Sequence, residues 1–279
     1  MQKLIIKGKK KLSGSINISG SKNATLPILA AALLTDKVIT LTNIPLVQDV
    51  YTMINLLKFI GLNIEMSKKS KILKVSSNRK LKTIAPYNLL KTMRAGVLVL
   101  GPLLAKYKKA KVSLPGGCAI GARPVNLHLF ALEKLGAKIK IKNGYIYASA
   151  KNGLKGNIIK FPSISVGATE NAILASVCAK GKTIISNCAI EPEIQDLIVF
   201  LKKLGCNINF VGKRKISIIG TKELKTTTHN VIFDRIELGT YLIAAALVGK
   251  KIIFLKIKPK IIKTEIKLLK KMGVKMKID

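Results

Sequence analysis

The sequence is poor in acidic residues, in arginine and in aromatic residues. Only 13 aspartates and glutamates stand against 50 lysines and arginines in 279 residues, which gives a formal net charge of +37. A charge of this size is typical of proteins that bind nucleic acid or anionic membranes. Yet only five of the basic residues are arginine, tryptophan is absent, and the lysines are spread along the whole chain. Because nucleic-acid readers rely on arginine forks and stacking aromatic rings, we expect no nucleic-acid partner.

A long apolar run is also missing. The longest, residues 95–105, is too short to span a bilayer. The first residues, MQKLIIKGKKKLSGS, lack the apolar centre and the cleavage site of a signal peptide. We therefore expect a cytoplasmic protein with no membrane partner. Its hydrophobic content of 48% is sufficient for one large domain or two ordinary ones.

Cysteine and histidine are too few and too scattered to form a metal site. The four cysteines form no CxxC pair and only two histidines accompany them, so we expect no metal and no cofactor. Cys178, Cys188 and Cys206 lie among apolar neighbours, which predicts that they pack as small buried side chains. Cys118 differs, because it lies in the glycine- and proline-rich segment SLPGGCAIGARPVNLH, residues 113–128.

A repeat of about seventy residues organises the chain. The segments LLKFIGLNIEM, ALEKLGAKIKI, FLKKLGCNINF and LLKKMGVKMKI share one pattern, in which an amphipathic helix stops at a glycine and a strand follows. Glycine is favoured there because the residue after a helix end often adopts a left-handed conformation. The four glycines are separated by 75, 69 and 68 residues, and they are Gly61, Gly136, Gly205 and Gly273.

The repeats predict the fold class and the domains. Each begins with an apolar helix and a short β-rich segment, followed by the amphipathic helix and further strands. We expect three repeats, residues 22–230, to form one complete lobe with helices inside and sheets outside. Residues 1–21 and 231–279 are expected to form part of a second lobe, because the fourth repeat stops within its strand at Asp279. The predicted fold is a two-lobed, inside-out α/β barrel whose second lobe is truncated at the C-terminus.

The loop around Cys118 has two possible explanations. Its glycines and prolines give it little reason to be buried, which predicts an accessible thiol on a mobile loop, five residues from Arg123. The alternative is an ordinary surface turn with an incidental cysteine, and composition alone leaves both open.

Unusual residues also mark the starts of the three apolar helices. Lys22 and Asn23 lie at the first, Arg94 lies at the second, and SVGATEN, residues 165–171, lies at the third. Helix capping explains each of them taken singly, whereas together they indicate a site for a polyanion. Arginine in such a site favours a carboxylate or phosphate ligand, because its planar fork forms two parallel hydrogen bonds.

These segments resemble the successive signatures of one enzyme family, the UDP-N-acetylglucosamine enolpyruvyl transferases. The matching segments are SGSKNATLPILAAALL, LVQDV, KTMRAG, SLPGGCAIGARPV, SVGATEN, EPEIQDL and FDRIELGTYLIAAAL. The resemblance covers the whole chain, and the PGGCxIGARPV loop is specific to that family. It implies transfer of enolpyruvate from phosphoenolpyruvate to UDP-N-acetylglucosamine with release of phosphate. This is the first committed step of peptidoglycan precursor synthesis, and so of cell wall biogenesis, cell shape and cell division.

The resemblance also implies residue roles. Lys22 and Arg123 would hold phosphoenolpyruvate with Arg94 close by, and Asn23 would contact the sugar nucleotide. Cys118 would act as the acid and form a covalent adduct with phosphoenolpyruvate, so that Cys118, Lys22 and Arg123 are the implied catalytic residues. The residues implied to line the nucleotide follow the cysteine or precede the third apolar helix: Arg123, Pro124, Val125, Asn126, Leu127, Ser163, Ile164, Ser165 and Val166.

The sequence departs from the family at two positions and in its length. Asn126 stands where the family generally has aspartate, and Ser163 stands where some members have lysine. The family's catalytic aspartate and further arginines are expected beyond residue 279. Three functions therefore remain open: a transferase, expected to be a monomer that needs a complementing C-terminal piece; a degenerate remnant that binds UDP-sugar without turnover; and a basic scaffold that binds nucleic acid.

Overall fold

The computed structural model describes residues 3, 5, 8, 11–77, 80–116 and 124–278. Its contacts divide the chain into two compact units. We name Ser21–Ile232 the large unit, and we name Met1–Gly20 together with Phe233–Asp279 the small unit.

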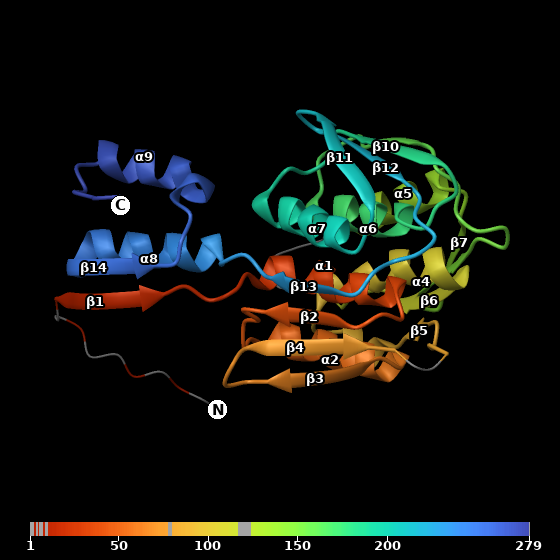
Figure 1. Ribbon diagram of the computed structural model, residues 1–279, viewed down its shortest axis with the longest axis horizontal. Coiled ribbons are helices and arrows are strands. Elements are labelled where there is room, and N and C mark those ends of the chain that lie inside the picture. Colours follow the sequence, from red (N-terminus) through yellow and green to blue (C-terminus); the bar gives the residue numbers. More distant parts are fainter. Residues whose placement is uncertain are drawn as a thin grey trace. The chain divides into compact units, whose positions relative to one another are not determined.

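The large unit contains three repeats with the same order of elements, coloured from red to light blue in Figure 1. The first comprises α1 (Lys22–Ala31), η1 (Ala32–Leu34), β2 (Ile39–Thr42), α2 (Gln48–Ile60), β3 (Asn63–Ser67), β4 (Ile72–Ser76) and β5 (Ile84–Ala85). The second comprises α3 (Tyr87–Leu90), η2 (Arg94–Val99), α4 (Leu100–Tyr107), β6 (Lys109–Ser113), α5 (Asn126–Lys134), β7 (Lys138–Lys142), β8 (Tyr145–Ser149) and β9 (Ile158–Lys160). The third comprises α6 (Val166–Ser176), β10 (Lys182–Ser186), α7 (Pro192–Lys203), β11 (Asn207–Gly212), β12 (Lys215–Ile219) and β13 (Thr227–Asn230).

Each repeat of the large unit has a sheet that takes one strand from the preceding repeat. β5, β9 and β13 follow the hairpins of the first, second and third repeats, and they pair in parallel with β6, β10 and β2. The three sheets have the orders β13-β2-β4-β3, β5-β6-β8-β7 and β11-β12-β10-β9. Within the described residues these sheets are not hydrogen-bonded to one another, so the strands form a ring of separate sheets and not one closed barrel.

The return of β13 to the first repeat closes this ring. Thr227 lies opposite Ile39 in the parallel pair. On its other side β13 is held by α7, because Nε2 of His229 lies 3.1 Å from Oδ1 of Asp196. The two ends of the large unit then meet, since the backbone N–H of Ser21 donates to the carbonyl of Ile232 at 2.7 Å.

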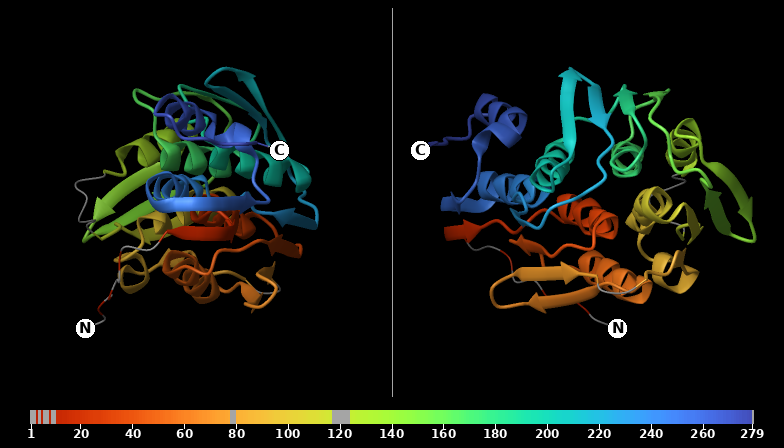
Figure 2. Two further views of the ribbon diagram at one scale, coloured as in Figure 1. Left: turned by 90° about the vertical axis from the view of Figure 1, so that its left-hand side faces the viewer. Right: turned by 45° about the vertical axis from the view of Figure 1, so that its right-hand side comes forward.

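The apolar helices form the centre of the large unit, and the sheets lie around them (Figures 1 and 2). Every residue from Ala24 to Ala31 in α1 is buried, as is every residue from Ala168 to Ser176 in α6. A helix that is apolar on all sides must be covered on all sides, which explains the composition of α1. The predicted α/β class, with helices inside and sheets outside, is therefore confirmed for the large unit.

The glycines that end the amphipathic helices behave as predicted. All four have positive φ, at 123°, 93°, 96° and 89° for Gly61, Gly136, Gly205 and Gly273. The strands expected after the first three are β3, β7 and β11. The prediction of a strand after Gly273 is wrong, because residues 274–278 do not form a strand. A strand needs a neighbour for its backbone groups, and no described strand pairs with these residues.

The three cysteines within the described residues pack against the core of the large unit. Cys188 and Cys206 are 0% and 6% exposed, as predicted, whereas Cys178 is only partly buried. Burial raises the pKa of all three thiols, and that of Cys206 rises to about 12. These thiols therefore carry little thiolate at neutral pH.

The small unit has a much smaller core. It contains the parallel pair β1 (Leu12–Asn17) and β14 (Gly249–Leu255), with α8 (Arg235–Val248), η3 (Pro259–Ile262) and α9 (Lys263–Lys271). Asp234 caps α8 by accepting from the N–H groups of Ile236 and Glu237 at 2.8 and 3.1 Å. Although α8 is apolar, Leu238 is its one buried residue, and Leu247 is 79% exposed. Such a helix normally requires a covering partner.

An asparagine at the centre of the large unit joins three helical segments. Asn171 on α6 accepts a hydrogen bond from the N–H of Gly101 on α4 at 2.8 Å. Its amide nitrogen donates to the carbonyl of Val97 and lies 3.2 Å from Nδ1 of His128. Every hydrogen-bonding group of the amide is then engaged, and Nδ1 of His128 acts as an acceptor. The neutral imidazole therefore carries its proton on Nε2.

We expect Gly101→Ala to destabilise the large unit. A Cβ atom at Gly101 would lie 2.3 Å from Oδ1 and 2.7 Å from the backbone oxygen of Asn171, so α4 and α6 would have to separate. The expected loss in the free energy of unfolding, measured by urea denaturation, is about 1–3 kcal/mol. Gly239→Ala is the matched control, because nothing lies within 4 Å of a Cβ atom at that helical position. Equal stability of the two variants would contradict the packing described.

We expect His128 to make the large unit acid-sensitive. Burial, and secondarily the charge of Arg94, lowers the pKa of His128 from 6.5 to about 4. The unfolded chain therefore takes up the proton first, so the stability that His128 contributes is complete above pH 6.5 and is lost as the pH falls towards 4. The loss reaches about 3 kcal/mol.

The measurement is urea denaturation between pH 7 and pH 4 for the natural chain and for His128→Asn. Asparagine retains an acceptor near Nδ1 but does not titrate, so the variant should show a shallower dependence over this range. Parallel pH curves would contradict the assignment.

Candidate active site

The starts of the apolar helices are capped in two of the three repeats. The hydroxyl of Ser21 accepts from the N–H of Ala24, and that of Ser165 accepts from the N–H of Ala168, both at 3.3 Å. Helix capping therefore accounts for these serines. It does not account for Lys22, the first residue of α1, because a cation is unfavourable at the positive end of a helix dipole.

Lys22 is held by an acidic residue of the next helix. Its Nζ lies 2.9 Å from Oδ2 of Asp49, and both side chains are partly exposed. Asp49 lies in the first turn of α2, where a carboxylate is favoured by the helix dipole. The sequence alone assigns no role to Asp49, because its position indicates only a favourable helix start. Asn23 follows Lys22 in α1.

Arg94 connects the start of the second apolar segment with the end of the cysteine loop. It is the first residue of η2, and its Nη2 lies 3.4 Å from the carbonyl oxygen of Pro124. The start of the loop lies beside the same segment, because a Cβ atom at Gly116 would meet the backbone of Lys91 at 2.1 Å. Gly116 and Pro124 therefore both lie near residues 91–94. Cys118 and Arg123 themselves lie outside the described residues.

The residues expected to line the nucleotide come from two neighbouring segments. Pro124 and the buried Val125 lead into α5, which begins at Asn126 and continues through Leu127. Ser163 and Ile164 lead into α6, which Ser165 caps and Val166 begins.

His128 links these two segments. A Cβ atom at Gly167, the second residue of α6, would lie 3.1 Å from Cε1 of His128. The start of α6 and the start of α5 are therefore in contact through this imidazole. In the sequence His128 is only the end of the cysteine loop, because its partner Asn171 is 43 residues away.

Three acidic residues gather near the starts of α6 and α7, although acidic residues are rare in this chain. Glu170 is buried on α6, one turn after Ser165. Burial, followed by the charges of Glu193 and Glu191, raises the pKa of Glu170 well above its usual value. Burial thus favours the protonated form of Glu170, which is able to donate a hydrogen bond. In the sequence these residues appear only within the segments SVGATEN and EPEIQDL, and their neighbours along the chain do not predict the pKa shift.

The described residues offer no further kind of site at these helix starts. They contain no group of three or more cysteine, histidine or acidic side chains that could hold a metal ion. No helix among them is long and apolar enough to cross a membrane.

Comparison with known sequences agrees with this picture. The model of the EPSP synthase (3-phosphoshikimate 1-carboxyvinyltransferase) family matches residues 6–279. A UDP-N-acetylglucosamine 1-carboxyvinyltransferase of Pelagibacter ubique is 59% identical over 276 residues, which are 99% of this chain and 66% of the relative. A protein of the same name from Endomicrobium trichonymphae is 52% identical, with the same coverage of both chains. The chain thus spans about two thirds of the length of these curated relatives.

Solved structures share the fold at low sequence identity. The enolpyruvyl transferase NikO from Streptomyces tendae superposes with a TM-score of 0.83 at 19% identity, covering 98% of this chain and 65% of that one. An EPSP synthase from Acinetobacter baumannii gives a TM-score of 0.78 at 20% identity, covering 96% and 61%. Together with the family match over almost the whole chain, these findings show that the chain belongs to the EPSP synthase family.

Proposed function

We propose that this chain is the larger part of a transferase that moves enolpyruvate from phosphoenolpyruvate to UDP-N-acetylglucosamine and releases phosphate. The observation that carries the proposal is the 59% identity to a UDP-N-acetylglucosamine 1-carboxyvinyltransferase over 99% of this chain. The contact of Arg94 with Pro124 supports it, because it holds the cysteine loop at a cationic helix start. The enzyme would act in the cytoplasm, in peptidoglycan precursor synthesis and thus in cell wall biogenesis, cell shape and cell division.

The cationic residues would bind phosphoenolpyruvate. Lys22, Arg94 and Arg123 offer positive charges that suit the phosphate and carboxylate of a small dianion or trianion. Asp49 would keep Lys22 in one orientation, since it holds Nζ at 2.9 Å. Asn23 would contact the sugar nucleotide at the start of the same helix.

Cys118 would supply the proton for the addition step. A thiol with an ordinary pKa near 8.5 is about 97% protonated at pH 7, so it is available as an acid. The proton would add to C3 of phosphoenolpyruvate while the sugar hydroxyl adds to C2 and loses its own proton. Loss of a proton from C3 and of phosphate from C2 would then give the enolpyruvyl ether. Alternatively, the thiol of Cys118 would bond covalently to C2 of phosphoenolpyruvate.

The nucleotide would lie between the second and third repeats. Pro124–Leu127, with Arg123, would line one side, and Ser163–Val166 would line the other. His128 supports this arrangement, because it fixes the spacing of the two segments and remains neutral at pH 7. Asn126 offers an amide to the nucleotide, where a carboxylate would accept hydrogen bonds only.

Turnover would require more than the present chain. The relatives are about half as long again, and α8 of the small unit exposes apolar residues that need a cover. We propose that a C-terminal piece completes the small unit, so that the closed enzyme excludes water from the reaction. The chain without that piece would bind UDP-sugar and turn it over poorly.

We expect the natural chain to be alkylated at Cys118 by fosfomycin, a small electrophilic mimic of phosphoenolpyruvate. The other three thiols are hindered by burial, which raises their pKa and lowers their content of reactive thiolate. Mass mapping of a partly alkylated sample should find the adduct on Cys118 first. Earlier modification of Cys178 or Cys206 would contradict the assignment of the loop.

We expect a fusion of this chain to the C-terminal third of the Pelagibacter ubique relative to release phosphate from phosphoenolpyruvate only when UDP-N-acetylglucosamine is present. Cys118→Ala should lower the rate by about 100-fold or more, because a positioned acid contributes at least that factor. Cys178→Ala is the control and should leave the rate unchanged. Phosphate release without the sugar nucleotide, or equal rates in both variants, would contradict the proposal. If the fusion binds the sugar nucleotide without turnover, the chain is a degenerate remnant of the transferase.

A further inference from the structure

We propose that the second repeat of the large unit carries a separate pocket for a phosphate or diphosphate group, between Gly136 and the turn at residues 150–153. The pocket is a hollow of about 330 Å³. None of its residues belongs to the candidate active site, so this inference stands apart from the proposed function. It follows from a comparison of three equivalent corners of the fold.

The three corners are built in the same way. In each repeat the amphipathic helix ends at a glycine with positive φ, which is Gly61, Gly136 or Gly205. The chain that leaves the following hairpin then passes the helix end and donates one backbone hydrogen bond to it. The donors and acceptors are Lys82 to Ile60 at 2.8 Å, Lys155 to Leu135 at 2.9 Å, and Lys225 to Leu204 at 2.9 Å. The corners can therefore be compared position by position.

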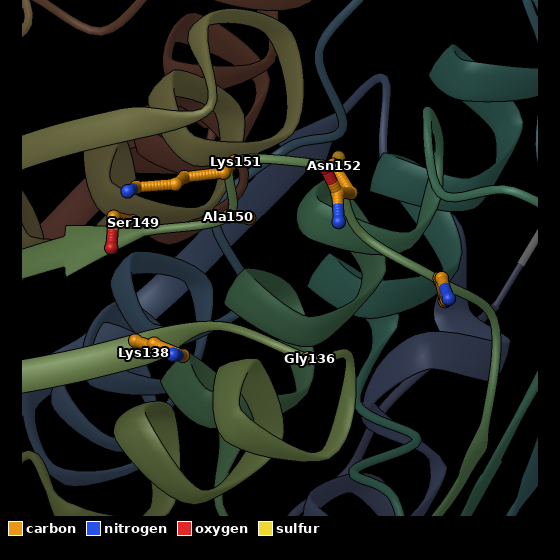
Figure 3. A pocket seen from close by; sticks show the side chains of 8 residues that line it. Gly136, Lys138, Ser149, Ala150, Lys151 and Asn152 are labelled. Atoms are coloured by element: carbon orange, nitrogen blue, oxygen red, sulfur yellow. The ribbon is translucent and has the colours of Figure 1, made fainter.

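Two of the corners are filled and one is hollow. In the first repeat, Cδ2 of Leu81 would lie 3.1 Å from a Cβ atom built on Gly61. In the third repeat, the methylene stem of Lys225 would lie 3.6 to 3.7 Å from one built on Gly205. In the second repeat nothing lies within 4 Å of one built on Gly136, or on Gly153 across the hollow. Figure 3 shows the open space between these two parts of the backbone.

The hollow corner also has lysines at positions where the other corners have neutral residues. Lys138 stands two residues after its glycine, where the first and third repeats have Asn63 and Asn207. Lys151 stands four residues before the hydrogen-bonded lysine, where the third repeat has Thr221. Lysine is common throughout this chain, but these two positions are lysine in the hollow corner and neutral in the corners just named.

The lining suits an anion with several oxygens. Lys138, Lys151, Ser149 and Asn152 line the hollow and are labelled in Figure 3. Lys155 lines it as well, so that its lining includes three ammonium groups, a hydroxyl and an amide. No acidic residue lines the hollow. Among the described residues, the three lysines form no salt bridge with a carboxylate. Several ammonium donors around one space match the charge and the oxygens of a phosphate group.

The size of the hollow restricts the ligand to a small one. At about 30 Å³ for each water molecule, the hollow has room for roughly eleven waters, at the lower end of the range for small-molecule sites. A hydrated phosphate or a diphosphate fits within this volume. Because the lysines are exposed, salt should weaken binding, and we expect a dissociation constant of about 1 mM at low ionic strength.

The test is titration of the natural chain, labelled with ¹⁵N-glycine, by inorganic phosphate and separately by inorganic diphosphate. The amide signals of Gly136 and Gly153 should shift and saturate, and the stronger of the two ligands identifies the group that the pocket takes. The chain should first be alkylated at Cys118, so that phosphate bound at the candidate active site does not contribute. If Cys118 is not alkylated but the amide signals of Gly136 and Gly153 still saturate, the result supports the pocket and contradicts the proposed function.

The first pair of substitutions, Lys138→Gln with Lys151→Gln, tests the hollow. The control pair is Lys140→Gln with Lys142→Gln. The control pair removes the same charge from β7, the strand that carries Lys138, but at residues that do not line the hollow. We expect the first pair to weaken binding about tenfold or more, and the control pair to change it less than twofold. Equal weakening by both pairs would show general attraction to a basic surface and overturn the proposal. A linear shift without saturation would overturn it as well.

Discussion

The large unit depends on the transfer of one strand from each repeat to the sheet of the next. β5, β9 and β13 all make this parallel contact, and β13 closes the ring by returning to β2. Without β13 the edge of β2 would expose unpaired backbone groups, and the sheet of the first repeat would be incomplete. The pairing of Asp196 with His229 and the hydrogen bond from Ser21 to Ile232 strengthen the same closure. The ring thus fixes where the three apolar helices begin.

The fixed helix starts explain how a site can arise from ordinary capping chemistry. Ser21 and Ser165 cap two of them, which leaves the neighbouring positions free for Lys22 and for the segment that contacts His128. Behind the site, Asn171 holds α6 to α4 and sets the tautomer of His128. Burial keeps His128 neutral at neutral pH, and it raises the pKa of Glu170, which favours the protonated form of that carboxyl group.

Divergence between the repeats is as informative as their similarity. The small unit has the apolar helix, the strand and the amphipathic helix of a fourth repeat, but α8 buries only Leu238 and residues 274–278 form no strand. These elements follow the same local pattern as in the large unit and lack the neighbours that would cover them. In the second repeat the divergence is smaller: the corner at Gly136 keeps its backbone geometry and loses the side chain that fills the others.

The sequence by itself determined the repeat, the helix stops at Gly61, Gly136 and Gly205, the burial of Cys188 and Cys206, and the family signatures. These features are encoded locally, by hydrophobic periodicity and by residues with special backbone freedom. Only the tertiary structure decided the strand exchange, the contact of Lys22 with Asp49, the links among Asn171, Gly101 and His128, and the hollow at Gly136. Each of these depends on contacts between residues far apart in the sequence, which the closed ring brings together. The local sequence does not encode those contacts.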